Sequence, residues 1–184
     1  MHSPHMRISA RGIAALAALT LVPILRPGVA SAADYHLGSL QITQPWARAT
    51  PKGAASGAAY MTVNNTGTKV AHLNCVSSDV AAKCEVHEMS MEGGVMRMRP
   101  VEGGLEIKPG QTITLKPGGF HIMLTGLKVP LREGNMLGAT LQADGGKTAQ
   151  VEFPIAPVGA PGPGGAAAGG AMKMQGAGMA PMSH

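Results

Sequence analysis

The sequence predicts an all-β protein, an antiparallel two-sheet β-sandwich with Greek-key connections. Turn signals rich in Gly, Pro and Asn interrupt the middle of the chain at short intervals, as they do in sandwiches and barrels. The runs between these turns are apolar or alternate, and no segment of helical length keeps a period of 3.6 residues. Because aromatic residues make up only 3% of the chain, aliphatic and methionine side chains must form most of the core.

The first element along the chain, residues 1–32, has the pattern of a cleaved signal peptide. Two arginines precede an apolar run from Ile13 to Leu25, and the small residues of "ASA" at 30–32 suit a cleavage site. A retained membrane anchor is the alternative, but the run is shorter than the roughly 20 residues of a spanning helix, and Pro23 interrupts it. We therefore expect an exported, periplasmic protein that is soluble after processing.

Residues 33–157 are expected to form one folded domain. Its expected strands are, in order, residues 58–63, 83–89, 95–101, 112–115, 120–124, 137–142 and 149–155, each bounded by turn signals such as "NNTG", "EGG" and "KPGG". Met61 and Met136 fall within or beside these strands, and we expect both to pack in the core because methionine fills irregular gaps well.

Residues 158–184 differ abruptly from the domain in composition. Gly, Ala and Pro at this density cannot bury enough surface to offset the entropy of ordering, so a disordered, flexible tail is expected. The tail nevertheless contains several soft donors for a metal, namely Met172, Met174, Met179, Met182 and His184. Composition alone therefore indicates a tail that captures a soft metal ion.

Charge and motif content argue against two broad classes of function. Fifteen basic residues, less the three arginines of the signal peptide, against 10 acidic ones leave a net charge of about +2, too low a field to indicate nucleic-acid binding. No Ser/His/Asp set, pair of carboxylates or phosphate-binding glycine loop stands out, so the chain is not expected to be an enzyme.

The two cysteines, Cys75 and Cys84, are expected to form a disulfide, because an exported chain folds under oxidising conditions. A thiol exchange enzyme is the alternative interpretation. Eight residues separate the two cysteines, however, and thiols tuned for exchange are closely spaced as Cys-x-x-Cys.

Imidazole and thioether side chains recur two residues apart in three of the expected strands. The pairs are His87 and Met89, Met96 and Met98, and His121 and Met123. In a strand, residues two apart share a face. A single such pair is ordinary core packing, but the repetition favours a metal site, and soft neutral thioethers beside imidazoles suit Cu(I) better than Zn²⁺, Mg²⁺ or Ca²⁺.

Three segments resemble the periplasmic copper chaperones of the PCu(A)C family over roughly residues 40–155. They are "WARATPKGAASGAAYMTVNNTG", "CEVHEMSMEGGVMRMRPV" and "LKPGGFHIMLTGL". The resemblance implies a cupredoxin-like β-sandwich with one Cu(I) bound near the surface by His87, Met98, His121 and Met123. The gap from Met98 to His121 is one residue longer than in the usual form of the family, which leaves Met89 and Met96 as alternative ligands in place of Met98.

The resemblance also implies a destination for the copper. Delivery is expected toward the Cu(A) site of cytochrome c oxidase, through the oxidase subunit that carries Cu(A) and with periplasmic thioredoxin-like copper proteins as further partners. Some members of the family have a His- and Met-rich C-terminal extension associated with a second copper. The tail of this chain fits that type, with His184 as its imidazole and Cu(I) or Cu(II) as the ion.

Two alternatives share the copper chemistry. Periplasmic sequestration or resistance needs the same ligands, so the sequence does not separate it from delivery. A blue-copper electron carrier would use Cys84, His87 and Met89, with the thiolate as a principal ligand. Strand alternation counts against this carrier, because Cys84 and His87 fall on opposite faces of the expected strand.

Overall fold

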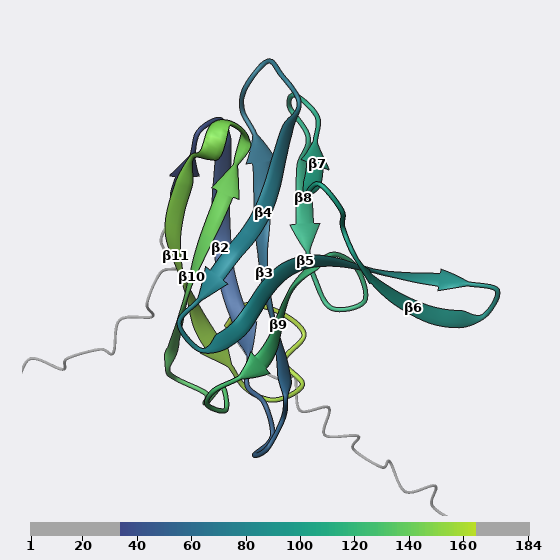
Figure 1. Cartoon of the computed structure of the whole chain (residues 1–184), viewed down its shortest axis with the longest axis vertical. Helices are drawn as coiled ribbons and strands as arrows, with labels where there is room; N and C mark the ends of the chain where they lie inside the picture. The colour runs from purple at the N-terminus through teal and green to yellow at the C-terminus, as the bar shows by residue number, and fades with distance from the viewer. Residues whose placement is uncertain (1–33, 165–184) are drawn as a thin grey trace, which may run out of the picture. The chain divides into compact units, whose positions relative to one another are not determined.

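The computed structural model describes residues 34–164 (Figure 1). Within this range no helix is long and apolar enough to cross a membrane. The signal peptide expected at 1–32 lies outside the described residues, as do the expected tail donors Met172, Met174, Met179, Met182 and His184.

Residues 34–164 contain eleven β-strands and one short 3-10 turn. The elements are β1 (Tyr35–Leu37), β2 (Leu40–Arg48), β3 (Ser56–Asn65), β4 (Ala71–Ser78), β5 (Ala81–Glu92), β6 (Val95–Pro100), β7 (Leu105–Ile107), β8 (Thr112–Leu115), β9 (His121–Leu127), β10 (Met136–Ala143), η1 (Asp144–Gly146) and β11 (Thr148–Ala156). Each of the seven expected runs falls on one of these strands. The seven expected runs do not include β1, β2, β4 or β7.

The strands form a β-sandwich, which confirms the predicted fold class. One hydrogen-bonded path runs β6-β5-β9-β3-β2-β11-β10-β4-β7, with β1 paired to β2 and β8 paired to β3. In Figure 1, β10 and β4 pass in front of β2 and β3. β11 belongs to both layers, because residues 148–154 pair with β10 whereas the last two residues pair with β2.

One pairing departs from the antiparallel expectation. Ile155 and Ala156, at the end of β11, run parallel to the end of β2. β10 begins at Met136, which pairs with Pro154, so the last two residues of β11 extend past it. The N–H of Ile155 donates to the Asn135 carbonyl and its own carbonyl accepts from Gly134, while the Ala156 carbonyl accepts from Ala49, just past the end of β2.

The core lies between the layers and is almost entirely aliphatic, as the low aromatic content predicts. Its largest fully buried side chains are Phe153, Leu37, Leu40, Ile42, Met61, Leu73, Ile107, Leu115, Ile122, Leu124, Leu137 and Leu141. Met61 therefore packs in the core as expected. The same expectation for Met136 is wrong, because strand alternation turns Leu137 inward and leaves Met136 exposed.

A disulfide joins the two layers. Cys75 in β4 and Cys84 in β5 are bridged, with their Cα atoms 5.3 Å apart, and both are buried. β4 pairs with β10 whereas β5 pairs with β9, so the bridge ties one layer to the other. Beyond the bridge, β5 and β6 form a hairpin that projects from the sandwich (Figure 1). The bridge thus anchors the base of this hairpin.

Candidate metal centre

The outer face of β5, β6 and β9 carries the imidazole and thioether side chains that the sequence singles out. Val86 and Ile122 point into the core, so their neighbours His87 and His121 point to the opposite face. The cross-strand partners on this outer face are His87 with His121, Met89 with Met98, and Glu85 with Met123. Pairing of three strands in this register therefore gathers donors from two distant parts of the sequence.

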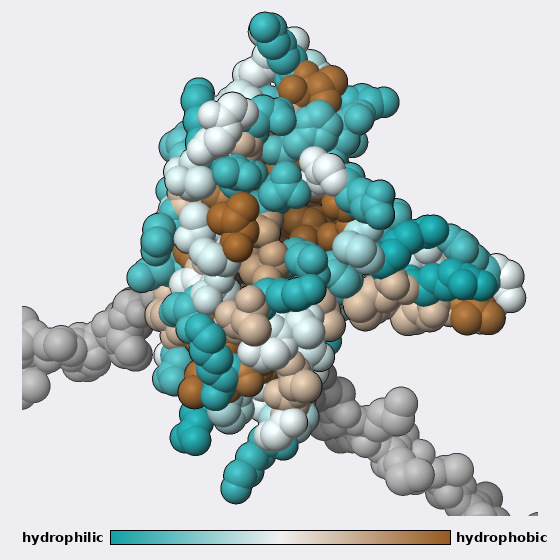
Figure 2. All heavy atoms as spheres, viewed as in Figure 1, coloured by the Kyte–Doolittle hydropathy of each residue, from teal (hydrophilic) through white to brown (hydrophobic). Residues whose placement is uncertain are grey.

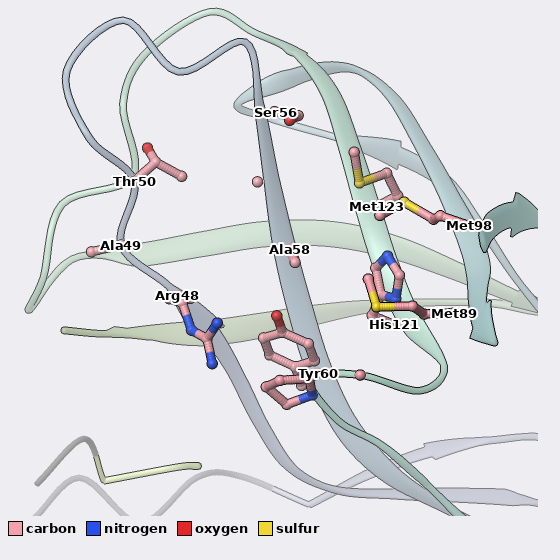
Figure 3. A pocket seen from close by; sticks show the side chains of 13 residues that line it. Arg48, Ala49, Thr50, Ser56, Ala58, Tyr60, Met89, Met98, His121 and Met123 are labelled. Carbon is pink, nitrogen blue, oxygen red and sulfur yellow. The ribbon is translucent and has the colours of Figure 1, made fainter. Parts of the chain in front are cut away.

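Four of these side chains line one open pocket of about 320 Å³. They are Met89, Met98, His121 and Met123. In Figure 3 the sulfur-bearing ends of Met98 and Met123 point toward each other, and the His121 ring lies beside Met89. Soft sulfur donors and an imidazole therefore face a common, solvent-connected space.

His87 and Met96, the other two sequence-predicted donors, do not line this pocket. His87 lies directly beside it, with its ring centroid 6.0 Å from that of His121. Met96 lies farther along the hairpin, opposite Met91, and is 61% exposed. Of the two alternative ligands, Met89 is thus at the pocket and Met96 is not.

A tight turn before β9 orients the His121 ring. Lys116–Gly119 forms this turn, with Pro117 at its second position and Gly118 at its third, where the φ of +82° favours glycine. The turn directs the Gly119 carbonyl at the His121 ring, 3.0 Å from Nδ1. A carbonyl only accepts, so Nδ1 carries the proton and Nε2 keeps its lone pair for a metal ion.

Burial keeps the His121 imidazole neutral. Its side chain is almost fully buried, and loss of solvation lowers the pKa of His121. The hydrogen bond to Gly119 opposes this shift, whereas the neighbouring His87 adds to it. A metal ion entering the pocket near neutral pH therefore meets an imidazole whose Nε2 has no proton to lose.

The two ring nitrogens of His87 have no hydrogen-bond partner among residues 34–164, although the side chain as a whole is only partly buried. Both Nδ1 and Nε2 are inaccessible to solvent and unpaired. The closest carboxylate oxygen, Oε2 of Glu85, lies 3.6 Å from Nε2, which is beyond hydrogen-bonding distance. Buried polar groups normally have a hydrogen-bond partner, so an unpaired imidazole at the edge of a donor pocket is suited to binding a metal ion.

The opposite wall of the pocket is polar and aromatic, and no sequence pattern predicted it. Arg48 and Tyr60 line this wall, and the Arg48 guanidinium lies 5.8 Å from the Tyr60 ring centroid. Burial raises the pKa of Tyr60. Arg48 also donates to the carbonyl of Ala160, which is fully buried beside Trp46. Packing therefore continues past the domain end expected at residue 157.

The sequence reasoning also missed Glu85. Strand alternation places it two residues before His87, on the same face, so the same parity argument identifies it. Glu85 is the one carboxylate that the register brings opposite Met123.

The donor atoms of the described residues suit a soft, singly charged metal ion. Residues 34–164 contain no cluster of three His, Cys, Asp or Glu side chains arranged for a metal. The donors that line the pocket are instead neutral thioethers and the His121 imidazole, which suit Cu(I). The disulfide removes the Cys84 thiolate, so the blue-copper alternative lacks its principal ligand.

The fold is the cupredoxin-like fold of PCuAC domains. The apo PCuAC domain from PmoF1 has a TM-score of 0.56 and 24% identity, covering 67% of this chain and 98% of its own. The copper-bound PCuAC domain from PmoF2 has a TM-score of 0.56 and 21% identity, covering 67% and 97%. The predicted resemblance is thus confirmed for the fold.

The chain belongs to the family described as "Putative lipoprotein LpqE-like", which matches residues 40–155. A relative from Leifsonia xyli subsp. xyli (strain CTCB07), Lxx21020, is also named as a lipoprotein. It is 33% identical over 142 residues, which cover 77% of this chain and 84% of the relative. The uncharacterized protein RP573 of Rickettsia prowazekii (strain Madrid E) is 35% identical over 109 residues, covering 58% and 60%.

Proposed function

We propose that this protein is an exported Cu(I) carrier, not an enzyme, and that His87, Met98, His121 and Met123 hold the ion. The observation that carries the proposal is the convergence of thioethers on a neutral imidazole in one open pocket, beside an orphaned second imidazole. Met89 lines the same pocket and serves as a reserve ligand.

The arrangement suits transport because it favours exchange over permanent burial. Four neutral ligands leave the ion with its single positive charge, and the pocket is open to solvent. Met98 is 48% exposed, so one ligand is accessible to an acceptor. The disulfide behind the site keeps thiols from competing for copper, and thioethers survive mild oxidants better than thiols.

Delivery toward the Cu(A) site of cytochrome c oxidase is the destination that we propose. It rests on the resemblance of the motifs to periplasmic copper chaperones and on the fold shared with PCuAC domains, one of which is described as copper-bound. The subunit that carries Cu(A) and thioredoxin-like copper proteins are the proposed partners. Periplasmic sequestration uses the same pocket and differs only in whether an acceptor receives the ion.

The metal site is tested by titrating the protein with Cu(I) against the chelator bicinchoninate, with X-ray absorption on the one-equivalent complex. We expect tight one-to-one binding with mixed nitrogen and sulfur ligation. His121→Gln combined with Met123→Leu should abolish it. The matched control combines His72→Gln and Met136→Leu, which lie outside the pocket, and should bind like the parent. Equal binding by both double variants would refute the pocket as the site.

Destination and tail need separate measurements. Copper transfer from the one-equivalent complex to the apo Cu(A) domain of the oxidase supports delivery, and retention by the carrier supports sequestration. For the tail we propose a second copper, Cu(I) or Cu(II), at the donors beyond residue 164. A chain ending at Gly164, which keeps the buried Ala160, should bind one copper ion fewer than the full chain and retain the tightly bound ion. Loss of the tightly bound ion would contradict the pocket site.

A further inference from the structure

The β5–β6 hairpin continues outward from the pocket with a second pair of methionines. Along the ladder, Met89 lies opposite Met98, and Met91 lies opposite Met96 two residues farther out. The outer pair is 64% and 61% exposed. Four thioethers therefore form two successive rungs that lead from the tip of the hairpin to the pocket.

The other face of the same hairpin is ionic. Glu92 pairs with Arg97 at 3.2 Å and also with Arg99. Figure 2 shows this division, with hydrophilic atoms along the upper edge of the projecting hairpin and apolar atoms along its lower edge. The arginine charges are thus directed away from the methionine face and paired with a carboxylate, so they do not repel a cation at the methionines.

Core packing does not explain the outer pair. Every residue of β6 is exposed, and Met91 and Met96 are absent from the buried core clusters. Directly opposite residues in an antiparallel pair have Cβ atoms about 4.5 to 5.5 Å apart. With three rotatable bonds each, the two thioethers can reach one ion between them.

We propose that Met91 and Met96 form a second, weaker Cu(I) site at the tip of the hairpin, from which the ion passes to Met89 and Met98 and then to the imidazoles. This inference rests on the proposed function of the pocket. The transfer involves no change in oxidation state. A bond to the next sulfur forms before a bond to the previous one breaks, so Cu(I) keeps a soft ligand throughout.

Two thioethers alone bind Cu(I) less tightly than a site that adds imidazoles, so affinity for the ion increases from the outer methionine pair to the pocket. An ion on the outer rung exchanges readily with a donor or an acceptor, while the pocket supplies the affinity. The distance between rungs is set by the strand, about 6.5 to 7 Å for two residues. Flexible methionine side chains span such a step without movement of the backbone.

The first experiment is methyl NMR of the full chain labelled with ¹³C at the methionine methyl groups. Tetrakis(acetonitrile)copper(I) is added in steps to three equivalents under anaerobic conditions. The first equivalent should shift Met98 and Met123, which tests the proposed function. Further copper should shift Met91 and Met96. If the pocket signals move and those of the outer pair never do, the inference fails while the proposed function stands.

The second experiment measures how fast bicinchoninate removes Cu(I) from the one-equivalent complex. Met91→Leu combined with Met96→Leu preserves the apolar surface but removes both sulfurs. We expect removal to slow by about tenfold with an unchanged dissociation constant, since the pocket is intact. Met136→Leu, an exposed methionine on another strand, is the matched control and should exchange like the parent. An unchanged rate in the double variant would overturn the inference.

Discussion

Replacing His87 with leucine should make the copper-free protein more stable while abolishing copper binding. Both ring nitrogens of His87 are buried and unpaired, and the Glu85 carboxylate, 3.6 Å from Nε2, is too distant to satisfy it. A buried polar group without a partner costs about 1 to 3 kcal/mol. Leucine removes both orphaned nitrogens and keeps a side chain of similar size, so the free energy of unfolding should rise by about 1 to 3 kcal/mol.

The assay for His87→Leu is urea unfolding of the copper-free protein, read as a shift of the midpoint at constant m value. His72→Leu is the matched control, because the Nδ1 of His72 lies 3.2 Å from an Asp144 oxygen and leucine would break this contact. We expect the control to gain no stability. If His87→Leu lowers the free energy of unfolding by about 1 kcal/mol or more, the histidine stabilises the fold and the argument for a metal ligand fails.

Three further predictions follow from the core, the bridge and the pocket. Replacing Cys75 and Cys84 by alanine removes a cross-link between positions nine residues apart. The free energy of unfolding, measured in urea, should fall by about 2.6 kcal/mol, and Cu(I) binding should be retained. A loss of binding would instead make the cysteines part of the site. Phe153→Ala should cost about 3 to 5 kcal/mol, and a cost below about 1 kcal/mol would contradict its place in the core. Burial lowers the pKa of His121, so as the pH falls the unfolded chain, with a histidine pKa of about 6.5, is protonated before the folded one. The free energy of unfolding should therefore be at its full value above about pH 6.5 and decrease below it. His121→Gln should flatten this decrease, measured by urea unfolding between about pH 7.5 and 5.5.

Local patterns of the sequence were sufficient to predict the class of fold and most of the donor set. Alternation is a property of the extended backbone itself, so His87 and Met89 share a face wherever their strand lies. The same holds for His121 and Met123. β4 and β7 alternate as well, with every second residue buried from Ala71 to Cys75 and from Leu105 to Ile107, but runs this short are distinguished as strands only by the strands they pair with.

The tertiary structure alone decided which donors meet. β9 lies between β5 and β3, and its register places His121 opposite His87. Such pairing depends on how whole strands bury their apolar faces and on the turns between them, which no local window contains. The turn that aims the Gly119 carbonyl at His121, and the wall formed by Arg48 and Tyr60, arise in the same way. The sequence therefore determined the candidate donors, and the long-range register determined which of them meet.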